Sequence, residues 1–376
     1  MAADVAASDL TKMTAFADGH LDAAAMSNPD QTLTRRKRAP IVPHGVQMQR
    51  VTRTTLRWRL GIAACAILTG ALPAVAQTTT RASASRWRVP RMPDGRPDLQ
   101  GTWTNNTATP LVRPADLAGK TYLTEEEAAE FERTWLSRLV EPLPEADRLG
   151  ADLSEVWFDP AKVVPDRRTS LIVEPETGVL PPLVPAAPDR TAARPPRNYD
   201  DPESRPLGER CLVGADIGGL SIGPPIVPNP LAFNYYRIVQ APTHLLIFSE
   251  LVHDVRLVRI GGEHLPPNIR RWFGDSIGHW EGDTLVVDTT NVSEKVQYRG
   301  STGRIHVVER LTRTGPSTIT YRATVDDPDT WSTPWTMEIP FAATSARLFE
   351  YACHEHNYSM AGALRGARAD EKAGKK

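Results

Sequence analysis

Histidine and carboxylate side chains come together at three places in the last third of this 376-residue chain. An imidazole next to a carboxylate can take up and release protons near neutral pH, because the carboxylate orients the ring and stabilises its charged form. We expect His253 and His354 to transfer protons, with Asp254 or Glu355 orienting them. His306 and Arg310 would stabilise developing charge. The predicted catalytic residues are thus His253, Asp254, His306, Arg310, His354 and Glu355.

The pattern around His306 predicts how this group is arranged. On a strand, His306 and Arg310 share one face, whereas Glu309 points to the other. If the first face lines a barrel interior, an imidazole and a guanidinium project into a ligand cavity. The alternative is an exposed face whose charges pair with acids on a neighbouring strand.

The C-terminal histidines allow a second kind of chemistry. His354 and His356 are two residues apart, so on a strand both rings project from one face and could bind one divalent metal ion. His253 or Asp254 would supply a third ligand. This spacing permits a metal site without being diagnostic of one, so a metal-dependent hydrolase or lyase is kept as an alternative.

Other catalytic patterns are weak. Gly219-Leu220-Ser221-Ile222-Gly223 matches a nucleophile elbow, but Pro224 and Pro225 follow where the required helix should begin. The chain contains no nicotinamide, flavin or nucleotide fingerprint, so we expect no organic cofactor.

The elements that must position these residues are short strands. The stretch Gly278 to Asp288 predicts a hairpin with its turn at Glu281-Gly282-Asp283. Period-two patterns around it predict strands at about 234–240, 244–251, 254–260, 278–281, 284–290, 305–313, 317–325, 335–341 and 347–354. We expect a mainly β protein with an antiparallel up-and-down barrel or a strongly curved, lipocalin-like sheet, because closure removes exposed edges. A β-sandwich is the alternative.

The region before these strands differs in composition. About half of the chain's 33 prolines lie between Pro142 and Pro230, which predicts extended arms that wrap around the sheet. One helix is expected after Thr124, where Thr124 and Glu127 match a capping box. Its apolar stripe is Ala128, Phe131, Trp135 and Leu139.

The N-terminus resembles an export signal. Arginines precede an apolar run from Leu60 to Leu72, and small residues follow at Ala74-Val75-Ala76. We expect five regions: a disordered or mis-assigned extension at 1–47, a signal peptide at 48–76, a helix plus proline-rich arm at 77–232, an antiparallel β domain at 233–360 and a disordered tail at 361–376. The expected location is periplasmic or secreted.

Two cysteines follow the predicted signal peptide. Cys211 and Cys353 could form a disulfide in an exported chain, and two reduced, buried cysteines are the alternative. A formal net charge of −1 shows no basic footprint for nucleic acid, and we expect no membrane association after signal cleavage.

Several motifs together resemble a family of uncharacterised exported bacterial proteins, and the resemblance spans nearly the whole predicted mature chain. It implies export but no particular activity. That family often has glycine where this chain has His356, so a role special to His356 does not follow from the resemblance. The motifs are Pro93 to Trp103, Glu209-Arg210-Cys211-Leu212, Val252-His253-Asp254, Leu265 to Arg270, Trp280 to Asn291 and Cys353-His354-Glu355.

Two classes of function fit these patterns. The first is an exported lyase, isomerase or hydrolase that acts by acid–base chemistry in a barrel cavity on a small, weakly polar molecule such as a sugar or phenolic compound. In the second, the same cavity binds its small-molecule ligand without catalysis.

Overall fold

The structure is a computed structural model. It describes residues 87–140, 160–185, 199, 201–213, 223–229, 233–296, 298–355 and 357–375, all within the unit Arg81–Lys376, and it leaves out the side chains of residues 139, 140 and 253. The expected extension at 1–47 and signal peptide at 48–76 lie outside the described residues, as does most of the nucleophile-elbow match. No helix in the described ranges is both long enough and apolar enough to span a membrane.

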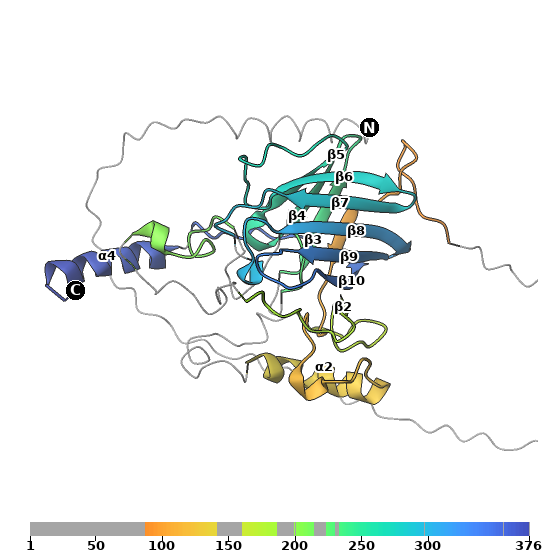
Figure 1. The fold of residues 1–376 in the computed structure, drawn as a ribbon, viewed down its shortest axis with the longest axis horizontal. Helices are drawn as coiled ribbons and strands as arrows, with labels where there is room; N and C mark the ends of the chain where they lie inside the picture. Colours follow the sequence, from red (N-terminus) through yellow and green to blue (C-terminus); the bar gives the residue numbers. More distant parts are fainter. Residues whose placement is uncertain are drawn as a thin grey trace, which may run out of the picture. The chain divides into compact units, whose positions relative to one another are not determined.

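The described chain forms a closed β-barrel, as the sequence predicted. Every strand but β2 contributes to closure, because β1 pairs with both β3 and β10 while the other strands follow in chain order. Figure 1 shows β5 to β10 side by side. The strands are β1 (Gly101–Thr104), β2 (Ile172–Glu174), β3 (Tyr235–Gln240), β4 (His244–Ser249), β5 (Val255–Ile260), β6 (Asp275–Glu281), β7 (Thr284–Thr290), β8 (His306–Gly315), β9 (Thr318–Asp326) and β10 (Trp335–Ala343).

The turn between β6 and β7 is the one predicted from the hairpin pattern. Glu281 pairs with Thr284, so Gly282 and Asp283 form the loop. Gly282 has a φ of 59°, a left-handed conformation that glycine adopts without the steric penalty of a side chain.

One strand pair departs from the predicted antiparallel order. β5 and β6 are parallel, with Val258 opposite Ser276. The chain turns at Gly261 and Gly262, as expected, but then continues through residues 263–274 before β6 begins. A parallel neighbour requires a long crossover of this kind, whereas a two-residue turn would force an antiparallel pair.

Two expectations for the C-terminal region were wrong. No strand forms at 347–354, because β10 already pairs with β9 on one side and with β1 and β2 on the other, which leaves no free edge. The expected disordered tail at 361–376 is largely helical, within α4 (Tyr358–Lys372). Asn357 caps α4 by accepting a hydrogen bond from the Met360 N–H, and the alanine-rich sequence favours the helix.

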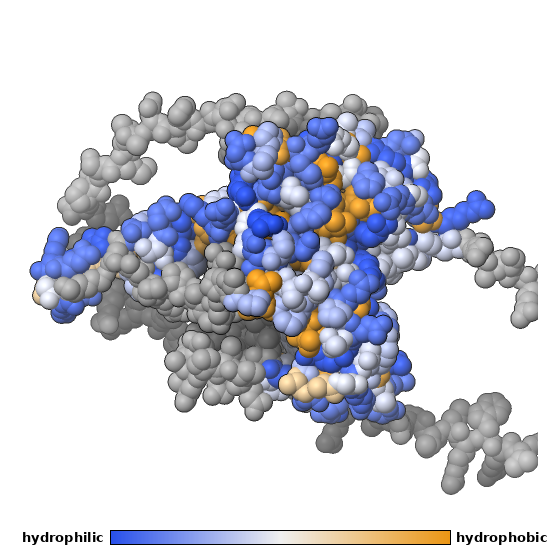
Figure 2. Space-filling view, viewed as in Figure 1, coloured by the Kyte–Doolittle hydropathy of each residue, from blue (hydrophilic) through white to orange (hydrophobic). Residues whose placement is uncertain are grey.

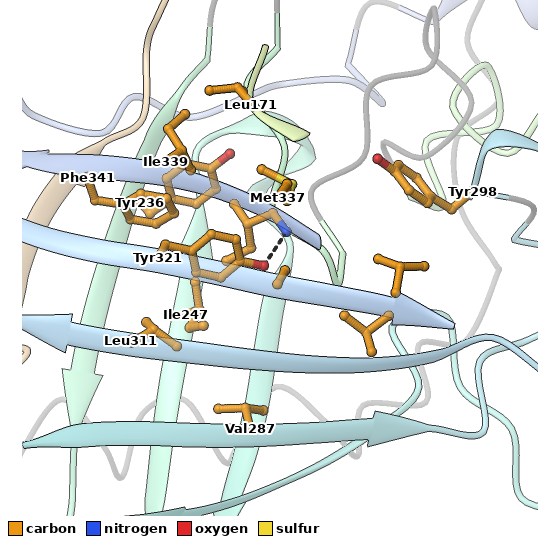
Figure 3. Packing of buried hydrophobic residues seen from close by; sticks show 14 of the residues in the cluster. Leu171, Tyr236, Ile247, Val287, Tyr298, Leu311, Tyr321, Met337, Ile339 and Phe341 are labelled. Carbon is orange, nitrogen blue, oxygen red and sulfur yellow. Dashed lines mark hydrogen bonds between the residues drawn. The ribbon is translucent and has the colours of Figure 1, made fainter. Parts of the chain in front are cut away.

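The region before residue 233 contributes directly to the barrel. β1 and β2 both precede residue 233, so the barrel extends across the domain boundary that we expected there. The short segment 223–229 also reaches the interior, where the Ile226 N–H donates to the Tyr321 hydroxyl at 2.7 Å. Figure 3 draws this bond as a dashed line.

Aromatic and aliphatic side chains fill much of the interior. Phe341 stacks on both Tyr236 and Tyr321, with ring centroids 5.7 and 5.1 Å away. Trp103 and Trp335 are also fully buried. Figure 3 shows the Tyr236, Tyr321 and Phe341 group between facing strands.

The predicted capping box begins α2 (Glu125–Val140), which lies near β2 in Figure 1. Thr124 Oγ1 accepts from the Glu127 N–H at 3.2 Å, and the Glu127 carboxylate accepts from the Thr124 N–H at 2.9 Å. Ala128 and Phe131 are buried against Leu123, as the predicted apolar stripe requires.

Removing this cap should open α2. We expect Thr124→Ala to lower the free energy of opening of the α2 amides by about 0.5–2 kcal/mol, since one N-terminal N–H loses its acceptor. Hydrogen exchange of these amides measures the loss. Thr134→Ala is the control, because Thr134 bonds only to main-chain carbonyls and Arg138 within the helix and alanine favours helix there. Equal exchange in both variants would contradict the role of the cap.

Candidate acid–base site at one end of the barrel

Most of the predicted catalytic residues lie at one end of the barrel, which we call the His306 end. Here β7 ends, β8 begins at His306, β9 ends at Asp326, and His306 lies opposite Asp326. β4 also ends here and β10 begins here, so the connections 250–254, 291–305 and 327–334 leave the barrel at this end.

A chain of histidines and carboxylates runs across the outer surface at this end. His306 Nε2 lies 3.0 Å from each oxygen of Asp288. Asp288 Oδ1 is also 3.0 Å from His264 Nε2, and His264 Nδ1 is 3.1 Å from Asp275 Oδ2. Arg259 ends the chain, with Nη2 2.9 Å from Asp275 Oδ2. We call this set the His306 chain.

Strand alternation and one pinned loop place these groups. Asp288 points outward from β7 because its neighbours Val287 and Thr289 face the interior. His264 lies in the crossover between β5 and β6, where the Leu265 N–H donates to Asp275 Oδ2 at 2.9 Å. Asn291 Nδ2 donates to the Leu265 carbonyl at 2.9 Å, which ties this loop to the end of β7. The loop is therefore held at Leu265, directly next to His264.

The charged groups of the His306 chain stabilise one another. The hydrogen bond from His306 lowers the pKa of Asp288. The hydrogen bond to Asp288 raises the pKa of His306, and the negative charge of Asp326 adds to that rise. Burial opposes the charge on Asp275, but the Leu265 N–H, His264 and Arg259 outweigh it and lower the pKa of this carboxyl. The carboxylates are thus held ionised beside the imidazoles.

His264 and His306 differ in what they can do. An ionised carboxylate only accepts hydrogen bonds, so His264 satisfies both of its contacts only when each ring nitrogen carries a hydrogen. His306 uses Nε2 for Asp288, and its Nδ1 has no hydrogen-bond partner among the described residues. Its side chain is 40% exposed. His306 is therefore the member of the chain that can exchange a proton with a molecule from solution.

The pair of Asp288 and His306 should make stability depend on pH. The raised pKa of His306 gives a contribution that is complete below about pH 6.5 and is lost as the pH rises through the folded-state pKa. The lowered pKa of Asp288 gives a contribution that is present above about pH 4 and is lost as the pH falls through its folded-state pKa.

We therefore expect Asp288→Asn to destabilise the protein more at about pH 5.5 than at about pH 9. Urea unfolding at both pH values measures the difference. Asp283→Asn is the control, because Asp283 pairs with Arg91, whose charge does not change in this range. A loss for Asp288→Asn that is the same at both pH values would contradict the pairing.

Arg310 shares a face with His306, as predicted, but that face is the outside of the barrel. Of the two possibilities that the sequence left open, the one in which this face lines the interior is excluded. Arg310 Nη2 pairs with Glu281 Oε2 at 2.5 Å, and both side chains are more than 40% exposed. The alternative from the sequence, an exposed face paired with acids on a neighbouring strand, is what the structure has.

The residue that faces inward is Glu309, which forms a buried charge network. Arg256 Nη1 donates to Glu309 Oε1 at 2.8 Å, and a second guanidinium nitrogen contacts Oε2. The Tyr321 hydroxyl donates to Oε1 at 2.6 Å. Arg256 also donates to Ser276 and Thr289, at 3.1 and 2.8 Å. Because every one of these groups has a partner, the network serves to join β5, β6, β7, β8 and β9.

The remaining predicted residues lie near the other connections of the His306 end. His253 ends the 3-10 helix η5 (Leu251–His253), its side chain is not described, and Asp254 caps this helix. His354 and Glu355 are exposed in a turn after Cys353. The Phe349 N–H donates to Glu250 at 2.8 Å, and Tyr351 packs edge-on against Phe233 at 5.3 Å. In the described residues, no hydrogen bond or ion pair joins His354 or Glu355 to the His306 chain.

The backbone near η5 is locally strained. Buried Val252 has a φ of 55°, although a β-branched residue strongly disfavours the left-handed region.

Cys211 also has a positive φ, and it forms a disulfide with Cys353 across a Cα–Cα distance of 5.8 Å. The predicted disulfide is therefore present.

No group of three or more histidine, cysteine or carboxylate residues in the described ranges has the arrangement of a metal site. His356 and the His253 side chain, two of the three proposed ligands, lie outside those ranges. The expected set of His354, His356 and His253 stays a prediction.

Sequence reasoning missed most of the His306 chain. Asp288 could have been found, because it alternates with inward-facing residues on a predicted strand, whereas Asp275 precedes the strand expected at 278–281. His264 and Arg259 gave no usable signal, since His264 lies in a loop and an arginine near a strand end is usually a solvated charge.

Comparisons with protein families, with curated proteins and with solved structures found no match to this chain. Its function is therefore argued from the geometry described above.

Proposed function

We propose that this protein is an exported enzyme that uses acid–base chemistry, with His306 as the residue that transfers the proton. The His306 chain is the observation that carries this proposal. It joins a half-exposed imidazole to an ionised carboxylate, and that carboxylate to a second histidine and a buried carboxylate. Clusters of titratable groups with shifted pKa values are common at catalytic sites.

The chemistry follows from the hydrogen bonds. Asp288 holds the His306 ring by Nε2, so that Nδ1 would accept a proton from a substrate or from a water molecule. The imidazolium that results is stabilised by Asp288 and by the charge of Asp326. His306 then returns the proton to the leaving group or to a neighbouring carbon. This cycle suits a lyase, an isomerase or a hydrolase.

The substrate class is proposed from the surface. The outer face of β6 to β9 is largely hydrophilic in Figure 2, with a few hydrophobic residues among the polar ones. A small, weakly polar molecule with hydroxyl groups, such as a sugar or phenolic compound, can reach His306 there without entering the barrel.

Export is the second part of the proposal. The pattern at 48–76 predicts a signal peptide. The disulfide between Cys211 and Cys353 supports this, because such bonds persist mainly in oxidising compartments such as the bacterial periplasm.

Turnover of a substrate panel tests the catalytic proposal. The panel comprises nitrophenyl esters, nitrophenyl glycosides and phenolic acids. We expect turnover of at least one compound, and a loss of about 10²–10⁴-fold in both His306→Gln and Asp288→Asn. His279→Gln is the matched control, because His279 is also an outer-surface histidine paired with a carboxylate, that of Glu281, and should keep full activity.

The outcomes separate the candidate functions. Equal turnover in wild type, His306→Gln and His279→Gln would place the chemistry elsewhere. Saturable binding of a panel compound with no turnover would favour a non-catalytic small-molecule-binding barrel.

A further inference from the structure

In the described part of the chain, the barrel interior at the His306 end contains buried polar atoms that have no hydrogen-bond partner. Tyr298 Oη, Ser301 Oγ and Trp335 Nε1 are among them. The Arg299 side chain lies near the Tyr298 hydroxyl but outside hydrogen-bond geometry. Ser249, the last residue of β4, and Asn105, just after β1, have unpartnered side chains at the same end. Asn105 lies near the Tyr236 hydroxyl but outside hydrogen-bond geometry. Buried polar groups nearly always have a partner, so this concentration calls for one.

The deeper interior shows that the barrel can satisfy its polar groups. The Tyr321 hydroxyl on β9 both donates to Glu309 and accepts from the Ile226 N–H. Among the described residues, most of the unpartnered groups therefore lie at the His306 end, although Trp280 Nε1 and Arg313 Nε at the opposite end also lack a partner.

Two of the unpartnered atoms, Tyr298 Oη and Trp335 Nε1, belong to a cluster of aromatic rings. Tyr298 stacks on Trp335 with a centroid distance of 6.4 Å, and Trp331 contacts Trp335 edge-on at 5.7 Å. Figure 3 shows Tyr298 set apart from the Tyr236, Tyr321 and Phe341 group, beyond Met337 on the side where β10 begins. The wall of this region is therefore aromatic with a few hydrogen-bonding atoms, as in many small-molecule sites.

A buried carboxylate holds the Tyr298 turn in place. Asp327 accepts hydrogen bonds from the Thr302 N–H at 2.5 Å, from Thr302 Oγ1 at 3.0 Å and from Thr330 Oγ1 at 3.0 Å. Thr302 follows Ser301 directly, so Asp327 fixes the turn that carries both unpartnered hydroxyls. Arg299, which lies between Tyr298 and Ser301 in this turn, has a φ of 50°, a strained conformation of the kind found at binding sites.

We propose that the Tyr298 and Trp335 end of the barrel binds a small, neutral aromatic molecule with oxygen acceptors, such as a phenol. The indole N–H of Trp335 can only donate, so the ligand must supply an acceptor there, whereas Tyr298 and Ser301 can donate or accept. Arg256 and Glu309, deeper inside, neutralise each other. Arg299 acts on the Tyr298 hydroxyl, but its side chain is exposed and solvent screens its charge, so neither an anion nor a cation is strongly favoured. This site is separate from the proposed catalytic group, because His306 points outward.

Calorimetric titration with 4-methylphenol tests the site. We expect saturable binding that weakens at least tenfold in Tyr298→Phe, a change that removes only the hydroxyl. Trp280→Phe should bind as wild type does, because Trp280 also has an unpartnered buried indole nitrogen but lies at the other end of β6. Benzoate, an anion of similar size, should bind at least tenfold more weakly than 4-methylphenol. Absence of saturable 4-methylphenol binding, an unchanged affinity in Tyr298→Phe, or benzoate binding as tight as that of 4-methylphenol would overturn the proposal.

Thermal unfolding without ligand gives an independent test. Tyr298→Phe removes a hydroxyl that has no partner, so its melting temperature should equal or exceed that of wild type. Tyr321→Phe removes a hydroxyl with two partners and should melt at a lower temperature. An equal fall in both variants would show that the Tyr298 hydroxyl is already bonded within the protein, and the site would be abandoned. Neither test involves His306, so failure here is distinct from failure of the proposed catalytic function.

Discussion

Glu309→Ala is expected to lower the free energy of unfolding by about 3–5 kcal/mol, because it leaves the Arg256 charge buried without its partner. Both side chains are at least 95% buried. Burial alone would disfavour the charge on Arg256, but Glu309 outweighs that effect and raises the pKa of this guanidinium. Urea unfolding followed by far-ultraviolet circular dichroism measures the loss.

Two further variants test the cause of this loss. Glu281→Ala removes the partner of Arg310 on the outer surface and should leave the urea midpoint nearly unchanged, since solvent takes over the exposed charge. The double variant Arg256→Met with Glu309→Leu removes both buried charges and should be more stable than Glu309→Ala. The buried pair would not have the role given to it if Glu309→Ala unfolded at the same urea concentration as Glu281→Ala.

Replacing both Cys211 and Cys353 by serine is expected to lower the free energy of unfolding by about 2–5 kcal/mol. The bond joins residues 142 apart in sequence, so it closes a loop that includes most of the barrel and restricts the unfolded chain. It also holds the start of α4, because Asn357 Nδ2 donates to the Glu209 carbonyl at 2.7 Å and contacts Cys211 Sγ at 3.4 Å.

Reduction provides the control for this prediction. Dithiothreitol should lower the urea midpoint of wild type to that of the double serine variant and should leave the variant itself unchanged. A wild-type midpoint that reduction does not alter would show that the bond contributes little to stability.

The sequence predicted the barrel because its strands alternate regularly. Most of the strands from β3 to β10 alternate buried with more exposed residues, as β3, β8 and β9 show, and the hairpin turn at Gly282 is local. The α2 capping box was also predictable, since both of its partners lie within four residues.

Features that depend on distant pairing could not be predicted. β1 has only four residues, and it is a strand because the edges of β3 and β10 both need a partner. The parallel pairing of β5 and β6 is set by the path of the crossover 261–274, which has no periodic pattern. The strand expected at 347–354 had a suitable pattern but no edge to pair with.

Which side of β8 faces the interior could not be decided from the sequence, for a physical reason. Alternation assigns His306 and Arg310 to one face and Glu309 to the other, and a charged residue is found on each. A buried glutamate is rare unless it is paired, and its partner Arg256 lies 53 residues away on β5. That pairing, which decides the orientation of the strand, is visible only in the folded structure.

The candidate site was only partly predictable for a similar reason. His306 stood out as a histidine close to other charged residues, but Asp288 reaches it from the neighbouring strand and His264 from a loop. Nothing in the local sequence of either residue indicates this meeting.

The central claim is that Asp288 holds His306 ready for proton transfer, and a nuclear magnetic resonance titration of the His306 ring tests it most directly. We predict a pKa above the ordinary histidine value in wild type and a fall toward that value in Asp288→Asn, with the His279 ring unchanged between the two proteins. A His306 ring that titrates identically with and without the Asp288 carboxylate would contradict the account.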